Sequence, residues 1–245
     1  MTAPTDRRHD TVGQPHRQRR ATDQRHEANR LRGDHALIAQ WIRPGSRVLD
    51  LGCGDGGLLA HLRAERAVTG YGIELEIDKV VRCIERGVNV IQGDLDAGLA
   101  DFDTGSFDYV IMSLTLQAVY FPARLLEEML RVGREGIVAF PNFGHLNCRL
   151  QLALGGRMPV SAALPEAWYE TDNIHLCTIR DFEALCDRLG IRILQRTVVN
   201  HQHRRSLGAR LLPNLLGEVA LYRFERSPDP TAIPHPESSH DTRPA

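Results

Sequence analysis

Apolar residues follow two different rhythms along the middle of the chain, and the two rhythms alternate. Short continuous apolar runs predict buried strands, whereas apolar residues at every third or fourth position predict helices that pack on a sheet. The expected strands are Arg47–Leu51, Val68–Glu74, Val88–Gln92, Phe107–Met112, Gly136–Phe140, Ile191–Val199 and Val219–Glu225. The expected helices take their apolar faces from Leu37, Ile38, Trp41 and Ile42, from Leu58, Leu59 and Leu62, from Ile77, Val80, Val81 and Ile84, and from the segments Pro122–Val132 and Arg180–Leu189. Repeated strand–helix units indicate an α/β fold with a mostly parallel sheet and helices on both faces.

The alternation is interrupted at residues 141–179, after the fifth expected strand. This segment opens with an amphipathic piece that carries Leu146, Leu150 and Leu154, and continues as a run punctuated by prolines. Connections of this length are usually functional or disordered. The content of Trp, Tyr, Leu and Met favours an ordered insertion, which we expect to serve as a lid over a site or as a docking face.

Both ends of the chain have a composition that favours disorder. Residues 1–33 carry eight arginines and almost no large apolar side chains, and residues 227–245 carry five prolines. Such segments bury too little apolar surface to offset the entropy of ordering them. We therefore expect one folded domain over residues 34–226, flanked by solvated tails at residues 1–33 and 227–245.

The charge balance argues against nucleic acid and membranes as partners. Thirty basic and 31 acidic side chains leave a net charge of −1, which supplies no general attraction for polyanions. No run approaches the roughly 18 apolar residues of a membrane-spanning helix. The five cysteines form no C-x-x-C pair, so a zinc site and a disulfide framework are poorly supported, and no metal is expected. Reduced thiols in the cytoplasm are the simplest interpretation.

The clearest chemical signal is a glycine-rich turn between the first expected strand and the helix after it. Gly52, Gly54, Gly56 and Gly57 follow the strand that ends near Asp50. Glycines allow a tight turn and the close approach of a ligand, and the helix N-terminus behind them offers free N–H groups. In a parallel sheet this turn lies at the carboxyl edge, where ligands bind. The spacing Gly52-x-Gly54-x-x-Gly57 also fits the dinucleotide-binding fingerprint, which by itself is weak evidence.

Three carboxylates favour an adenosine with a cationic tail over a pyrophosphate. Asp50 precedes the glycines, Glu74 ends the second strand within reach of two ribose hydroxyls, and Asp94 follows the third strand, where it could accept a hydrogen bond from the adenine amino group. S-adenosylmethionine has such a tail. The residues expected to contact this cofactor are Asp50, Gly52, Cys53, Gly54, Asp55, Gly56, Glu74, Asp94, Leu95 and Ser113.

Each of these assignments has a plain structural alternative. The glycines could serve only a strand-to-helix turn, Glu74 could be a solvated carboxylate, and Asp94 could belong to an ordinary Gly-Asp turn. Cys53 suits a small filler within the loop better than a nucleophile. Asp55 could be merely exposed, and Ser113, with its neighbours Leu114 and Gln117, could be ordinary loop packing.

In these residues the chain resembles the class I S-adenosylmethionine-dependent methyltransferases. The resemblance spans roughly residues 35–226. It implies a Rossmann-like fold with a seven-stranded sheet, in which the last strand is antiparallel, and S-adenosylmethionine as the cofactor. The matching runs are Asp50-Leu-Gly52-Cys-Gly54-Asp-Gly56, Gly72-Ile-Glu74, Gly93-Asp94-Leu95 and Phe107-Asp108-Tyr-Val.

A more specific resemblance, to the methionine biosynthesis protein MetW family, rests on runs outside the cofactor motif. Members of that family are linked to methionine synthesis alongside a separate protein, a homoserine O-acyltransferase. The resemblance implies the same role and the same partner for this chain. The runs that carry it are Leu114-Thr-Leu-Gln117, Glu128-Met-Leu-Arg-Val-Gly133, Phe140-Pro-Asn-Phe-Gly-His145, Gly156-Arg-Met-Pro159 and Asn173-Ile-His-Leu-Cys177.

No catalytic constellation is evident around the expected cofactor. His145, Tyr169 and His175, in the insertion, are candidate general bases, although a structural hydrogen bond is the plainer role of each. Three functions therefore stay open. The first is an accessory or regulatory subunit of the acyltransferase, and the second is a methyltransferase that acts on a small molecule. The third, a nicotinamide-dependent oxidoreductase, lacks a Tyr-x-x-x-Lys pair, because Lys79 is the single lysine.

Overall fold

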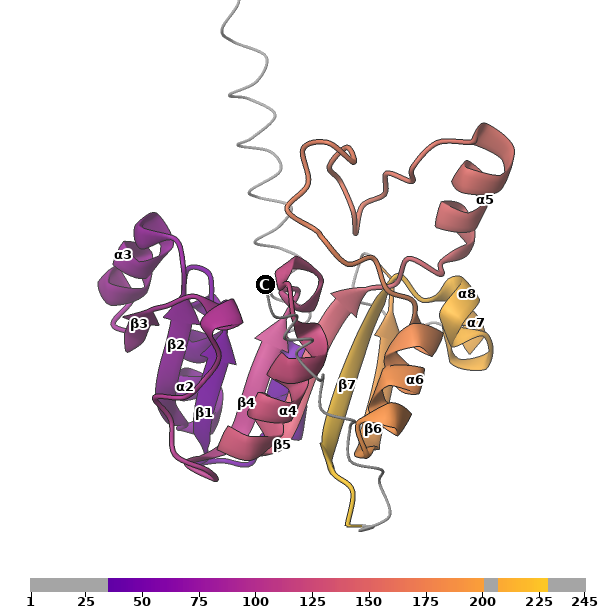
Figure 1. Ribbon diagram of the computed structural model, residues 1–245. Coiled ribbons are helices and arrows are strands. Elements are labelled where there is room, and N and C mark those ends of the chain that lie inside the picture. Colours follow the sequence, from indigo (N-terminus) through magenta and orange to yellow (C-terminus); the bar gives the residue numbers. More distant parts are fainter. Residues whose placement is uncertain (1–34, 201–206, 229–245) are drawn as a thin grey trace, which may run out of the picture.

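The computed structural model describes residues 35–200 and 207–228, which form one sheet with helices on both faces (Figure 1). The predictions for residues 1–33 and for most of residues 227–245 lie outside the described residues. A first helical segment covers residues 35–41 and precedes the sheet.

The sheet has seven strands in the order β3-β2-β1-β4-β5-β7-β6 (Figure 1). β1 pairs in parallel with both β2 and β4, whereas β7 runs antiparallel to its neighbours β5 and β6. This confirms the mostly parallel sheet and the antiparallel last strand. The strands are β1 Arg47–Leu51, β2 Thr69–Glu74, β3 Val90–Gln92, β4 Phe107–Ser113, β5 Gly133–Pro141, β6 Ile191–Val199 and β7 Val219–Arg226.

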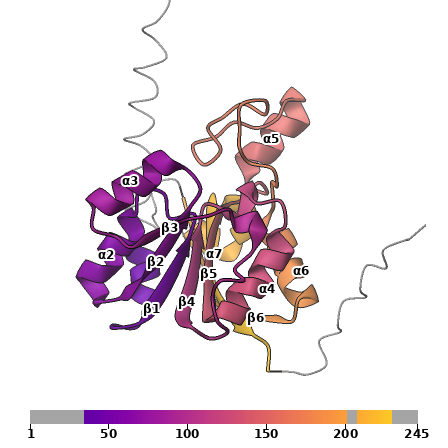
Figure 2. The ribbon, with the colours of Figure 1, turned by 60° about the vertical axis from the view of Figure 1, so that its left-hand side comes forward.

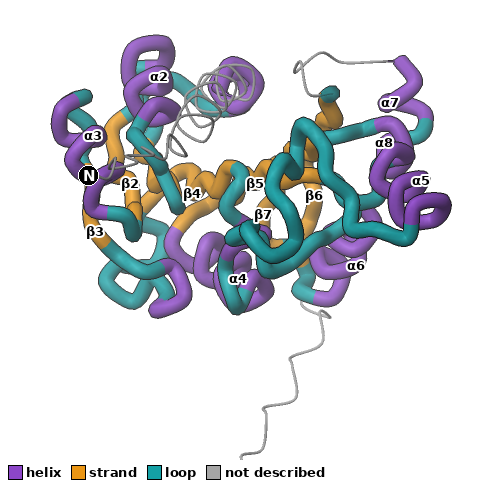
Figure 3. The backbone as a smooth tube through the Cα atoms, turned by 90° about the horizontal axis from the view of Figure 1, so that it is seen from above, coloured by secondary structure: helices purple, strands orange, loops and turns teal. Residues whose placement is uncertain are grey.

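Two apolar layers sandwich the sheet. One layer joins α2 and the helical segment 35–41 to the sheet through residues such as Leu62, Ile38 and Val48. The other joins α4 and α6 to the opposite face, where Leu126 and Phe182 are fully or almost fully buried. Figure 3 shows α2 and α4 on opposite sides of the strands. The helices are α2 Gly57–Arg66, α3 Ile77–Glu85, α4 Pro122–Val132, α5 Leu146–Gly155, α6 Ile179–Arg188, α7 Leu207–Leu211 and α8 Pro213–Leu216, with short 3₁₀ turns η1 Leu95–Ala97 and η2 Leu116–Ala118.

The strand order places a switch point between β1 and β4. From β1 the chain moves outward to β2 and β3, and then returns to β4 on the other side of β1. At such a point the connections leave the carboxyl edge in opposite directions and open a crevice. The loops that follow β1, β2 and β4 therefore converge on one place.

The apolar stripe expected on α3 was wrong in part. Val80 and Cys83 are buried, but Ile77, Val81 and Ile84 are exposed. The reason is the position of α3 beside β3, the three-residue edge strand of the sheet. So short an edge strand covers only a narrow side of the helix that packs beside it. The rest of the apolar stripe of α3 therefore faces solvent.

The insertion after β5 is built from α5 and a long irregular segment, residues 156–178. The Phe143 amide donates to the Cys177 carbonyl at 3.0 Å and so joins the two ends of the insertion, and the Ile174 amide donates to the Gln117 carbonyl at 2.8 Å and so ties the insertion to the body. Thr178 then caps α6 in a capping box with Asp181. Figure 2 shows α5 standing above the carboxyl edge of the sheet.

The leucines of α5 do not face the body of the protein. Leu146, Leu150 and Leu154, expected as the apolar face of an amphipathic piece, are all exposed, and Cys148 is the buried residue of the helix. The sequence pattern predicted the helix but not its surroundings, because apolar periodicity does not show what covers an apolar face.

Candidate functional site

The glycine loop, residues 52–56, connects β1 to α2 in left-handed backbone conformations. Gly52, Gly54 and Gly56 have φ angles of 69°, 58° and 75°. A Cβ on Gly52 would lie 2.5 Å from the Thr115 Oγ1 atom, whereas a Cβ on Gly54 would meet nothing within 4 Å. The loop is therefore packed at Gly52 and open at Gly54, so a ligand can approach the backbone at Gly54.

Glu74, at the end of β2, holds this loop through its buried carboxylate. Its Oε2 atom accepts a hydrogen bond from the Gly54 amide at 2.8 Å. Its Oε1 atom accepts from the amides of Leu75 and Glu76, at 2.9 and 3.1 Å. Three of the roughly four acceptor positions of a carboxylate are therefore in use, and about one is left for a ligand.

Asp50 is the unusual residue of the site. Its side chain is only 2% exposed, and none of the described residues donates a hydrogen bond to it. Burial, and then the neighbouring charge of Glu74, raise the pKa of the Asp50 carboxyl from 3.8 to about 7. A buried carboxylate without donors is costly unless a cation or a donor accompanies it. The arrangement is therefore suited to a ligand that brings positive charge.

Two other loop residues, Cys53 and Asp55, face away from the opening. The Cys53 Sγ atom lies 3.7 Å from the Cys83 Sγ atom, and burial raises the pKa of the Cys53 thiol, which disfavours the reactive thiolate. This position fits the small-filler alternative. Asp55 accepts a hydrogen bond from the Gly57 amide at 3.1 Å and forms an ion pair with Arg86 at 2.8 Å. Both contacts fasten the start of α2.

The residues after β3 are more exposed. Asp94 is exposed, and its Oδ1 atom accepts a hydrogen bond from the Asp96 amide at 2.9 Å, which caps η1. The side chain of Leu95 packs against the core on the α4 side of the sheet. Asp94 keeps a second carboxylate oxygen available, whereas the Leu95 side chain points away from the glycine loop side.

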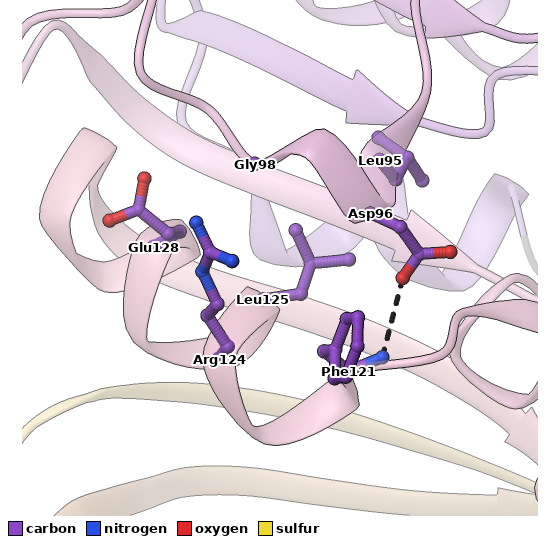
Figure 4. Close-up of a pocket in the computed structure, with 7 residues that line it drawn as sticks. All are labelled: Leu95, Asp96, Gly98, Phe121, Arg124, Leu125 and Glu128. Atoms are coloured by element: carbon purple, nitrogen blue, oxygen red, sulfur yellow. Dashed lines mark hydrogen bonds between the residues drawn. The ribbon is translucent and has the colours of Figure 1, made fainter. Parts of the chain in front are cut away.

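Asp96 is a structural residue that the sequence did not reveal. Its Oδ1 atom accepts hydrogen bonds from the amides of Tyr120 and Phe121, just before α4, at 2.8 and 3.3 Å, and Figure 4 shows the bond to Phe121. Asp96 therefore fixes the segment that leads into α4, from 24 and 25 residues away. The small pocket beside it, lined in part by Arg124, has a volume of about 10 Å³, which is room for about one water.

Buried polar atoms without partners gather after β4. Within the part of the chain that the structure describes, Ser113 Oγ and Gln117 Oε1 are buried and have no hydrogen-bond partner. Between them, Leu114 adopts a left-handed conformation with φ 56°. Unsatisfied buried atoms cost about 1–3 kcal/mol each, and non-glycine residues with positive φ cluster at functional sites. The carboxyl end of β4 therefore carries the features of a ligand-facing segment.

The three candidate bases do not come together. His145 is the N-cap of α5, where its Nδ1 atom accepts a hydrogen bond from the Asn147 amide at 3.2 Å. It also lines a cavity of about 260 Å³ together with Ser161 and Glu218. Tyr169 is 70% exposed, and the exposed His175 has its Nε2 atom 3.3 Å from the Tyr120 carbonyl oxygen. His145 is thus the one of the three that lines this cavity.

Other kinds of site are not indicated. No group of three or more His, Cys, Asp or Glu side chains within residues 35–200 and 207–228 could hold a metal ion. In the same residues no helix has both the length and the apolar character needed to cross a membrane. All five cysteines are free.

Comparison with known proteins gives one family match and a partial relative. The family model described as methionine biosynthesis protein MetW matches residues 32–224. A bifunctional methionine biosynthesis protein MetXA/MetW from Rhodopirellula baltica is 36% identical over 205 residues, which cover 80% of this chain and 33% of that protein. The chain therefore spans about a third of the length of that relative.

Two further likenesses concern methyltransferases. A ubiquinone biosynthesis O-methyltransferase from Hahella chejuensis is 30% identical over 176 residues, which cover 63% of this chain and 73% of that enzyme. A chain from the complex between the Haloferax volcanii Trm112 methyltransferase activator and a putative methyltransferase matches with a TM-score of 0.60 and 16% identity, covering 88% of this chain and 97% of that one. The second likeness shows the fold, which is the Rossmann-like fold of class I methyltransferases, as expected.

Proposed function

This chain belongs to the methionine biosynthesis protein MetW family, and on that premise we propose that it binds S-adenosylmethionine at the glycine loop and serves a homoserine O-acyltransferase as an accessory subunit. The observation that carries the ligand is Asp50, a residue that is 2% exposed and whose carboxylate has no hydrogen-bond donor among the described residues. S-adenosylmethionine brings both a sulfonium and an ammonium group. Either cation would stabilise the ionised form of Asp50.

The remaining groups suit the other parts of this ligand. Glu74 has about one acceptor position left for a ribose hydroxyl, and more if the Gly54 amide turns to the ligand. Asp94 has a free carboxylate oxygen for the adenine amino group. The exposed side chain of Leu75, next to Glu74, offers an apolar surface to the base. When bound, S-adenosylmethionine supplies an activated methyl group, but the accessory role requires only that it binds.

The acyltransferase partnership is supported by the Rhodopirellula baltica relative. Its name joins MetXA to MetW, and the region similar to this chain takes up 33% of it. The described residues carry no nucleophile–base pair beside the glycine loop that would indicate a catalytic role of its own. S-adenosylmethionine is the end product of the methionine route, so a subunit that binds it could report that product to the acyltransferase. A cytoplasmic location stays a prediction.

Calorimetric titration tests the ligand. The wild type, Asp50→Asn, Glu74→Gln and the control Asp55→Asn are titrated with S-adenosylmethionine and S-adenosylhomocysteine. We expect at least tenfold weaker binding in Asp50→Asn and Glu74→Gln. Asp55→Asn should bind like the wild type, because Asp55 faces Arg86 rather than the opening. A wild type that does not bind S-adenosylmethionine would overturn the ligand assignment.

An acyltransferase assay tests the role. Homoserine O-acyltransferase from the same organism is assayed alone, with this protein, and with this protein plus S-adenosylmethionine. We expect this protein to change the rate, and S-adenosylmethionine to modulate that change in the wild type but not in Asp50→Asn. Identical rates with and without this protein would refute the accessory role.

A second candidate function is methyl transfer to a small molecule. The cavity of about 260 Å³ that His145 lines is slightly below the size of drug-sized ligand pockets and could hold a small acceptor. The relative from Hahella chejuensis is an O-methyltransferase by name. Formation of S-adenosylhomocysteine with an acceptor panel, and its loss in His145→Gln, would favour this function. No product with any acceptor would count against it.

A further inference from the structure

α5 is an apolar helix that the described residues of the protein leave largely uncovered. Leu146, Leu150 and Leu154 are 38%, 46% and 82% exposed, and Cys148 is the buried residue of the helix. Isolated helices shorter than about 12–15 residues are marginal in water, and most of a helix's stability in proteins comes from packing. α5 has ten residues. The described residues therefore give it little of the packing that helices of this length normally require, and Figure 1 shows it projecting from the carboxyl edge of the sheet.

Three of the four leucines of α5 lie along one stripe of the helix, and the fourth lies opposite them. Leu146, Leu150 and Leu154 repeat every four residues and share one side. Leu152 is also exposed, and at about 100° per residue it lies about 200° from Leu150. Cys148, four residues before Leu152, lies on that same side and is buried, so the described residues already cover part of it. The side left uncovered is the stripe of Leu146, Leu150 and Leu154, which a groove in a partner would cover.

The charge of the insertion indicates which kind of partner fits. Over residues 146–176 the charged side chains are two arginines and three acids, Arg149 and Arg157 against Glu166, Glu170 and Asp172, which leaves a net charge of −1. Membrane-surface helices carry basic residues on their polar face, and nucleic acid requires a basic patch. With one arginine on α5 and a net charge of −1 over the insertion, neither a basic face nor a basic patch is formed here, so the apolar surface is suited to a protein.

We propose that α5 is the element by which this protein binds homoserine O-acyltransferase, with the helix inserted into an apolar groove of that enzyme. The proposal rests on the proposed function for the identity of the partner. Helix-in-groove recognition uses apolar anchors at helical spacing, and Leu146, Leu150 and Leu154 have that spacing. The irregular segment beside the helix adds the exposed rings of Trp168 and Tyr169, which contact each other edge to face with their centroids 5.7 Å apart. Aromatic residues of this kind are enriched at interfaces.

Two pairs of substitutions in the full-length chain separate α5 from the other exposed apolar helix face. Leu150→Glu with Leu154→Glu changes α5, and Val81→Glu with Ile84→Glu changes the exposed face of α3, where both side chains are about as accessible. A third variant, Leu150→Ala with Leu154→Ala, removes apolar area from α5 and keeps a high helix propensity. Each protein is titrated into the acyltransferase by calorimetry and is also titrated with S-adenosylmethionine.

We expect at least tenfold weaker binding to the acyltransferase in both α5 variants, wild-type binding in the α3 variant, and unchanged S-adenosylmethionine binding in all three. Wild-type binding by both α5 variants would overturn the proposal and leave the proposed function standing. A wild type that does not bind the acyltransferase would overturn both. Light scattering measures the oligomeric state of the wild type and of the α5 variants. If the wild type is a dimer, and the α5 substitutions dissociate it without changing acyltransferase binding, then α5 serves self-association and the proposal is refuted.

Discussion

The Glu74 carboxylate accepts a hydrogen bond from the Gly54 amide at 2.8 Å, so the end of β2 holds the loop that follows β1. The same carboxylate is the group proposed to bind ribose. It therefore shapes the loop before any ligand is present, and it has to share its acceptor positions when the ligand arrives. The charge of Glu74 raises the pKa of Asp50, but no amide among the described residues donates a hydrogen bond to the Asp50 carboxylate. The two carboxylates should consequently respond to neutralisation in opposite ways.

Asp50→Asn should stabilise the protein at pH 8. The pKa of Asp50 is raised from 3.8 to about 7 in the folded state, so between these values the folded protein holds a proton that the unfolded chain releases. The free energy of unfolding of the wild type therefore falls as the pH rises through this window and stays low above pH 7. Asparagine does not ionise, so at pH 8 the free energy of unfolding of Asp50→Asn should exceed that of the wild type by up to about 4 kcal/mol.

Urea unfolding at pH 8 and pH 5 measures this effect. At pH 5 the difference in the free energy of unfolding between Asp50→Asn and the wild type should be less than about 2 kcal/mol. The reason is that most of the pH range between the two pKa values, 3.8 and about 7, lies above pH 5. Asp94→Asn, the same substitution at an exposed position, serves as the control. An asparagine variant no more stable than the wild type at pH 8 would contradict the burial of an unpaired charge.

Glu74→Gln should have the opposite sign and destabilise the protein by about 2 kcal/mol at pH 8. Three backbone amides donate to the carboxylate, and hydrogen bonds to charged groups contribute about 1.5–3 kcal/mol each. A glutamine keeps one carbonyl oxygen and presents an NH₂ group to the remaining donors. Urea unfolding measures this difference: the midpoint of Glu74→Gln should lie below that of the wild type, and the midpoint of Asp50→Asn above it. A stabilised Glu74→Gln would be incompatible with these three hydrogen bonds.

Binding of S-adenosylmethionine should weaken as the pH falls below 7. The ligand's cation favours ionised Asp50, so at lower pH binding must first release a proton from a carboxyl whose pKa is about 7. The affinity should drop by up to about tenfold per pH unit between pH 6.5 and 5. Calorimetry in two buffers of different ionisation enthalpy would detect the proton released at pH 6. Asp50→Asn supplies the control, with a weaker but flatter profile.

The glycines of the loop should separate stability from binding. In Gly54→Ala the left-handed backbone costs about 1–2 kcal/mol, and the new methyl group projects into open space where the ligand is expected, so binding is lost while the fold remains. Gly52→Ala adds a contact of 2.5 Å with the Thr115 side chain and should destabilise more. The double variant Gly52→Ala with Thr115→Ala should regain part of the lost stability, as measured by its melting temperature. An unchanged melting temperature relative to Gly52→Ala alone would mean that the strain lies elsewhere.

Ligand binding should also slow hydrogen exchange in the insertion. The amides of Ile174 and His175 both donate to the Gln117 carbonyl, at 2.8 and 2.9 Å, and Gln117 lies two residues after Thr115, which packs over Gly52. A ligand that steadies the loop should therefore slow exchange at residues 174 and 175 several-fold, as read by mass spectrometry. Peptides from β6 and β7 should be unaffected, and the effect should be absent in Asp50→Asn.

Much of the fold could be predicted from local pattern. All seven strands lie within three residues of their expected bounds, because buried parallel strands read as continuous apolar runs. β5 begins three residues early, at Gly133, directly after α4. The exposure of Ile84 on α3 and of Leu154 on α5 could not be predicted, since periodicity identifies an apolar face without identifying what covers it.

The candidate site divides in the same way. The sequence by itself determined that glycines follow β1 and that the carboxylates Asp50 and Glu74 lie at the ends of β1 and β2, because strand ends and left-handed turns leave local signals. Only the tertiary structure decided what each group does there, since hydrogen bonds and burial depend on residues distant in the chain. In the folded protein Glu74 accepts a hydrogen bond from the Gly54 amide, and Asp55 forms an ion pair with Arg86. Asp96 accepts a hydrogen bond from the Tyr120 amide, just before α4, and Asp50 is buried without a donor among the described residues.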